Sequence, residues 1–243
     1  MNVHQKAGEA ASIHPVSRRA VLRTALGATA AGALFTQGFN FISPQGVFAQ
    51  SALTPAQALQ ELQEGNRRFT QGRMTHHTED LAVLRQHTEE KQEPFAAVLS
   101  CADSRVPVEL IFDQSIGHVF VTRLAGNVAT TEIIASLEYG AAVLGTKVIV
   151  VLGHSNCGAV KAAIAGKEVP GQISALYLPL RPAVEAAGSD LVAAIKANAR
   201  IQAKLLSESS PVISGLIKAG KMTVAAAYYN VADGTVTMLP KES

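Results

Sequence analysis

The two cysteines and one nearby histidine of this chain are well suited to hold a metal ion. Cys101 stands alone, while His154 and Cys157 form a His-x-x-Cys pair 53 residues further along. Two thiolates and one imidazole are a typical ligand set for Zn²⁺, and they leave its fourth position open. On spacing alone, two alternatives stay open: a disulfide between the cysteines, or two small buried side chains beside a core histidine.

An acidic and a basic residue accompany the first cysteine. Asp103 and Arg105 are two positions apart, so in an extended segment they project to the same side. A neighbouring arginine keeps an aspartate ionised and fixed, able to accept a hydrogen bond from an oxygen on the metal. A plain structural ion pair is the alternative, but the position beside a candidate ligand favours a catalytic role.

Both clusters follow apolar runs that predict strands. Continuous runs of this kind are typical of strands covered on both faces of a sheet, and there are three of them: 95–100, 119–122 and 147–152. The segment 130–144 has helical spacing and lies between the second and third runs, which predicts a crossover in a parallel sheet. The carboxyl ends of parallel strands share one edge of a sheet, so we expect the two clusters to form one site.

The remaining pattern is mostly helical. Residues 54–71 begin with a capping box and a first-turn proline, and their apolar face needs a covering surface, for which a neighbouring subunit is one candidate. Helices are also expected at about 157–165 and 189–207, and a hairpin around Asp233-Gly234. We therefore expect an α/β fold with a central, mostly parallel sheet flanked by helices and an N-terminal helical arm.

The first 49 residues have the features of an export signal. Arg18 and Arg19 precede a mildly apolar stretch, 24–35, that is shorter than the ~20 residues of a membrane-spanning helix. The paired arginines resemble a twin-arginine signal, and cleavage after Ala49 would leave Gln50 first. We expect residues 1–49 to be removed and 50–243 to form one exported, periplasmic zinc domain with no membrane anchor.

The composition excludes several other classes of protein. With 48% hydrophobic and 16% charged residues, the chain is not disordered, and two cysteines cannot build a disulfide-rich miniprotein. The net charge is +2, and residues 1–49 contain four basic and one acidic side chain, so the remainder is close to neutral. General nucleic-acid binding therefore has no electrostatic support.

The order Cys-x-Asp-x-Arg followed by His-x-x-Cys, on the ends of predicted strands, resembles the β-class carbonic anhydrases. The likeness runs from about Leu53 to about Leu239 and includes the flanking segments 104–107, 123–127 and 156–158. The resemblance implies that one Zn²⁺ is bound by Cys101, His154 and Cys157. It also implies that Asp103 and Arg105 form the catalytic pair, with Asp103 able to become a fourth ligand in a closed state.

The resemblance extends to the substrate pocket. Gln92, Phe120 and Tyr139 stand where the plant-type branch places its substrate-binding residues. Val98 replaces a tryptophan typical of an inhibitory bicarbonate pocket, although Arg123 and Tyr229 match its other residues. We therefore expect the open form of the site.

The activity implied is reversible hydration of CO2 to bicarbonate and a proton, by attack of zinc-bound hydroxide. The family builds its sites at subunit interfaces, so a homodimer or a higher even oligomer is expected, with Gln92 able to serve the neighbouring zinc. Three alternatives are a hydrolase of carbonyl sulfide or carbon disulfide, a non-catalytic exported zinc protein, and a disulfide-stapled binding protein.

Overall fold

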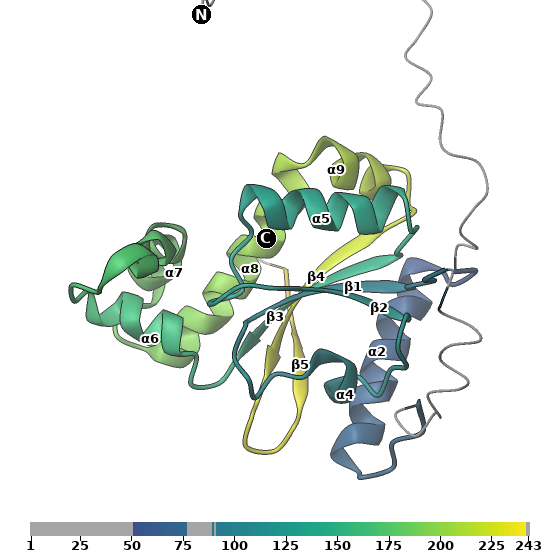
Figure 1. Ribbon diagram of the computed structural model, residues 1–243, viewed down its shortest axis with the longest axis horizontal. Coiled ribbons are helices and arrows are strands. Elements are labelled where there is room, and N and C mark those ends of the chain that lie inside the picture. The colour runs from purple at the N-terminus through teal and green to yellow at the C-terminus, as the bar shows by residue number, and fades with distance from the viewer. Residues whose placement is uncertain (1–50, 77–88, 90, 242–243) are drawn as a thin grey trace, which may run out of the picture. The chain divides into compact units, whose positions relative to one another are not determined.

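The computed structural model describes residues 51–76, 89 and 91–241 (Figure 1). All of them belong to the unit Gly46–Ser243, the larger of the two units of the chain. The expected signal peptide at 1–49 lies outside the described residues. None of the helices in the described part of the chain is both long and apolar enough to cross a membrane.

A five-stranded sheet forms the centre of this unit, with the strand order β2-β1-β3-β4-β5. The strands are β1 (Ala96–Ser100), β2 (Val119–Arg123), β3 (Val148–His154), β4 (Thr223–Tyr229) and β5 (Val236–Leu239). The first four are parallel, and β5 pairs antiparallel with β4 as the expected hairpin. Every residue of β1 and β3 is buried, which explains their uninterrupted apolar sequences. The prediction of a mostly parallel α/β sheet is confirmed.

Helices cover both faces of the sheet. Figure 1 shows α5 (Thr131–Ala142) and α9 (Pro211–Lys218) on one face, and α2 (Pro55–Thr70) and α4 (Val108–Ile111) on the other. The remaining helical elements are α6 (Gly158–Ala165), η2 (Gly171–Leu176), α7 (Tyr177–Ala187) and α8 (Leu191–Ser209). Of these elements, α4, η2, α7 and α9 were not predicted from the sequence.

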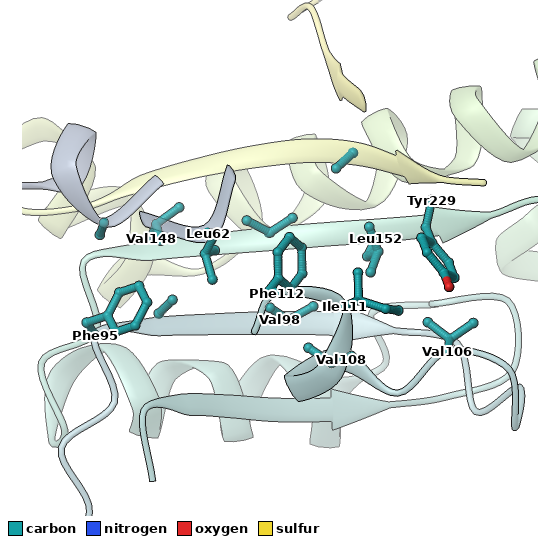
Figure 2. Close-up of a cluster of buried hydrophobic side chains, with 14 residues drawn as sticks. Leu62, Phe95, Val98, Val106, Val108, Ile111, Phe112, Val148, Leu152 and Tyr229 are labelled. Carbon is teal, nitrogen blue, oxygen red and sulfur yellow. The ribbon is translucent and has the colours of Figure 1, made fainter. Parts of the chain in front are cut away.

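The helical arm α2 packs on the core of its own chain. Figure 2 shows Leu62 beside Phe112 and Val98 in one continuous apolar cluster, and Leu62 is 1% exposed. Gly65 permits close approach, because a Cβ atom there would lie 1.7 Å from the carbonyl oxygen of Phe112. A neighbouring subunit is therefore not needed to cover this part of the helix.

The carboxylate of Asp113 joins α2 to the turn after α4. It is fully buried and accepts a 2.6 Å bond from Arg68, and it also accepts the backbone N–H groups of Thr75 and His76 at 3.1 Å. Burial alone would raise the pKa of Asp113, but these hydrogen bonds outweigh it and hold the pKa below its ordinary value. The bonds fix the chain that leaves α2.

Asp113→Asn is expected to lower the free energy of unfolding by about 1–3 kcal/mol at pH 7, because a neutral amide satisfies the buried donors less well. A carboxyl whose pKa is lowered by folding stabilises above its unfolded pKa of about 3.9, and this contribution is lost as the pH falls below it. The variant should therefore lose less stability than the native chain on acidification. Urea unfolding between pH 7 and 3 measures both effects, with Glu168→Gln, at an exposed position, as the control. If the free energy of unfolding of Asp113→Asn fell with acidification as steeply as that of the native chain, the stabilising role of the Asp113 carboxylate would be contradicted.

Candidate metal centre

Three candidate ligands come together at the carboxyl edge of the sheet. Cys101 directly follows β1, His154 is the last residue of β3, and Cys157 is the N-cap of α6. In the register of the sheet, Ser100 pairs with Leu152, so the two strands end side by side. The cysteine sulfurs and a ring nitrogen of His154 lie within 4.8 Å of one another, and all three residues are buried.

The donor atoms of this group fit a metal ion. Nδ1 of His154 lies 3.0 Å from the carbonyl oxygen of Ser155, which suits an Nδ1–H donor and leaves a lone pair on Nε2. That Nε2 atom is buried and has no hydrogen-bond partner in the described part of the chain. A buried nitrogen without a partner costs free energy, and a metal ion would satisfy it.

Both cysteines are free thiols rather than a disulfide. A hydrogen bond shared with Cys157 lowers the pKa of Cys101 against the opposing effect of burial, and the backbone N–H of Gly126 lowers it further. The bond with Cys101, together with burial, raises the pKa of Cys157. Binding of a metal ion requires both sulfurs to be deprotonated, so it would release the protons that they hold. The disulfide-stapled alternative disagrees with this structure.

Asp103 and Arg105 form a close ion pair next to the ligands. Arg105 donates from Nε to Oδ1 at 2.9 Å and from Nη2 to Oδ2 at 2.7 Å. These bonds hold the pKa of Asp103 well below its usual range. The same Oδ2 lies 3.9 Å from Nε2 of His154, so the ionised carboxylate faces the ligand cluster.

The backbone around this pair differs from the expectation. The sequence predicted an extended segment, but the N–H of Val106 donates to the carbonyl of Asp103 at 3.1 Å, which makes a turn. The Asp103 side chain also accepts the backbone N–H of Arg105 at 3.0 Å. Short-range side-chain bonds of this type favour turns over strands, and they bring the two side chains together.

Arg123 and Arg105 brace the backbone of the site. Arg123, at the end of β2, donates to the carbonyls of Cys101 at 3.0 Å and Asp103 at 2.5 Å. Arg105 also donates to the carbonyl of Asn156 at 3.3 Å, which joins the two ligand segments. The sequence placed Arg123 only in a bicarbonate pocket. The sequence did indicate that Arg123 lies at the end of a strand, near the edge where the ligands are, and this could have suggested that it contacts their backbone.

The three expected substrate residues do not join the cluster within one chain. Phe120 and Tyr139 lie together, with ring centroids 6.3 Å apart, but Phe120 pairs with Ala97 near the amino end of β1. Gln92 is exposed and precedes β1 at the edge opposite the ligands. Their substrate-binding role therefore remains a prediction, and it requires a neighbouring subunit.

A mostly parallel sheet flanked by helices, with a Cys-His-Cys group at its carboxyl edge, is typical of a metalloprotein with an α/β fold. A family model described as carbonic anhydrase matches residues 96–236. The chain therefore belongs to the carbonic anhydrase family, in its β class, and is an enzyme. Members of this class are zinc enzymes.

Individual relatives agree with this assignment. The chain is 34% identical over 192 residues to carbonic anhydrase 2 of Mycobacterium tuberculosis, covering 76% of this chain and 92% of the relative. It is 35% identical over 193 residues to a carbonic anhydrase of Mycolicibacterium smegmatis, covering 76% and 93%. The solved β-carbonic anhydrase CafA of Aspergillus fumigatus is 26% identical with a TM-score of 0.61, covering 77% and 91%.

Proposed function

We propose that this protein catalyses the reversible hydration of CO2 to bicarbonate and a proton, with one Zn²⁺ held by Cys101, His154 and Cys157. The observation that carries the proposal is the buried Nε2 of His154, which has no hydrogen-bond partner among the described residues and lies within 4.8 Å of two free thiols. The paired Asp103 beside this group distinguishes it from a purely structural zinc site, which would need no such carboxylate.

Zn²⁺ bound to such residues lowers the pKa of a water ligand and so supplies a nucleophile near neutral pH. The role of Asp103 is to accept a hydrogen bond from the attacking water and to orient it toward the carbon of CO2. Arg105 keeps the carboxylate ionised and in one orientation through its two bonds. The proton released by the water passes to solvent, and bicarbonate leaves.

We further propose that the complete site forms between subunits of a homodimer or a higher even oligomer. Gln92 and Tyr139 are exposed in the single chain, and Tyr139 retains 45% of its accessible surface. The Tyr139 ring packs on Phe120 but remains exposed to solvent, and exposed aromatic rings of this kind are common on surfaces that another subunit covers. In this arrangement Gln92, Phe120 and Tyr139 would line the CO2 pocket of the neighbouring subunit.

Export by the twin-arginine route is also proposed, on the basis of Arg18, Arg19 and the apolar stretch that follows them. A protein folded around its metal before export would keep both thiols from oxidation. N-terminal sequencing of the periplasmic form tests this, with Gln50 expected as the first residue. A protein that stays in the cytoplasm with residues 1–49 still attached would contradict the proposed export.

Stopped-flow measurement of CO2 hydration with a pH indicator tests the proposed activity. The zinc-loaded protein should accelerate hydration, lose this activity when a chelator removes the metal, and regain it when Zn²⁺ is restored. The same preparation assayed with carbonyl sulfide shows whether the substrate is assigned correctly. Turnover of carbonyl sulfide with no acceleration of CO2 hydration would overturn the proposal.

A further inference from the structure

A buried amide on helix α8 reaches the loop that contacts the Cys101 sulfur. Asn198 has no exposed surface, and its Nδ2 donates to the carbonyl of Gly126 at 2.8 Å. The N–H of the same Gly126 donates to Sγ of Cys101 at 3.3 Å. One residue of the loop is therefore fixed by α8 through its carbonyl and bound to the candidate ligand through its N–H.

One residue of this loop, Asn127, has a backbone conformation that side chains disfavour. Gly126 has φ +77° and Asn127 has φ +45°, so two consecutive residues adopt the left-handed conformation. For a residue with a Cβ atom this conformation costs free energy and persists only where the surroundings impose it. The Asn198 amide bonds the carbonyl of Gly126, whose carbon forms the peptide bond with Asn127, and so holds the backbone immediately before that residue.

A second buried amide orients Asn198. Gln202 lies one helical turn later on α8, is 2% exposed, and donates from Nε2 to Oδ1 of Asn198 at 3.2 Å. Its Oε1 accepts the N–H of Ala129 at 3.0 Å, and its Nε2 also lies 3.3 Å from the carbonyl of Pro179. Both amides are thus satisfied, which is the condition for a buried polar network to be rigid.

Helix α8 is itself held against the strand that carries another ligand. Gly153 directly precedes His154 in β3, and a Cβ atom there would lie 2.9 Å from Cγ2 of Ile195. The helix therefore touches the backbone of β3 immediately before His154. Its contacts fix the histidine strand and the loop over the cysteine relative to one another.

We infer that Asn198, oriented by Gln202, is a positioning residue for the metal: it holds the Gly126 N–H on the Cys101 sulfur and so sets the position and electron density of that ligand. The inference rests on the proposed zinc site. Groups that hydrogen-bond metal ligands are known to affect metal affinity by about 10-fold to 100-fold when they are changed. No sequence motif links Asn198 to the cysteine, because 72 residues separate it from Gly126.

Zinc affinity measured by chelator competition tests this inference on the full mature chain. Asn198→Ala and Gln202→Met should each weaken zinc binding, the first by about 10-fold to 100-fold. In the cobalt-substituted protein, both variants should also shift the sulfur-to-cobalt charge-transfer absorption, since the bond to the sulfur is disturbed. Circular dichroism establishes that each variant is folded.

Leu206→Ala is the matched control. Leu206 is fully buried on the same helix, eight residues after Asn198, and packs in the apolar cluster that includes Leu137 and Ile213 rather than the one that includes Cys101. It should destabilise the fold and leave zinc affinity and the cobalt spectrum unchanged. Two results would overturn the inference while the zinc site stands. One is a wild-type zinc affinity and cobalt spectrum in Asn198→Ala, and the other is an equal loss of zinc affinity in Leu206→Ala. A native protein that binds no zinc would remove the proposed function itself, and this inference with it.

Discussion

Replacement of Cys101 by serine is expected to remove zinc from the protein and to abolish CO2 hydration. Cys101 is 4% exposed, and its sulfur lies within 4.8 Å of the donor atoms of His154 and Cys157. Those two residues already supply one ligand each, so neither can replace the lost sulfur. A change to a neighbouring group already costs about 10-fold to 100-fold in metal affinity, and loss of a ligand should cost more. Metal analysis after dialysis measures the zinc content of the variant.

Ser100→Ala is a suitable control for this experiment. Ser100 is the adjacent buried residue, and its hydroxyl donates to the carbonyl of Cys101 at 3.3 Å and is not one of the three grouped donors. We expect this variant to retain zinc and activity. A Cys101→Ser protein that keeps a full zinc complement and hydrates CO2 would show that the cysteine is not a ligand.

Replacement of Asp103 by alanine is expected to separate catalysis from metal binding. The carboxylate is paired with Arg105 and is not one of the three grouped donors, so the variant should retain zinc. The attacking water would lose its orienting hydrogen bond, and misorientation of a reacting group costs on the order of 100-fold in rate. The value of kcat from stopped-flow CO2 hydration, combined with metal analysis of the same sample, measures both effects.

The exposed Ser104 lies in the same turn and offers a matched control for Asp103. Ser104→Ala should change neither zinc content nor kcat. Equal losses of zinc and activity in Asp103→Ala would mean that the carboxylate supports the metal rather than the reaction. Full activity in that variant would remove Asp103 from the mechanism.

The sequence predicted β1 and β3 well because burial on both faces leaves an unambiguous pattern, whereas β2 is a strand as expected but lies at the edge of the sheet and is only partly buried. The runs that became β1 and β3 are apolar at almost every position, and they are buried throughout. The four-residue helix α4 is too short to show a helical period, and the sequence also failed to predict α7 and α9. Both are short, with 11 residues in α7 and eight in α9, and α7 also contains Pro182, a residue that is unfavourable inside a helix.

The candidate site was only partly predictable, for a related reason. Cys101 and His154 could be placed together because each follows a strand of a parallel sheet, and that topology follows from the sequence pattern. The bonds that brace the site involve backbone groups instead: Arg123 binds carbonyls, and Gly126 offers its N–H. All residue types have a backbone carbonyl, and all except proline have an N–H, so these groups leave no signature in the sequence. Asn198 contacts the Gly126 carbonyl only because the tertiary fold brings the two together.

X-ray absorption spectroscopy at the zinc edge of the mature protein tests the central claim most directly. We expect zinc bound by two sulfur atoms and one imidazole nitrogen with one further light atom, and metal analysis of the same sample should give about one zinc per chain. Zinc surrounded only by oxygen and nitrogen, or cysteines oxidised to a disulfide in a metal-free yet active enzyme, would contradict it.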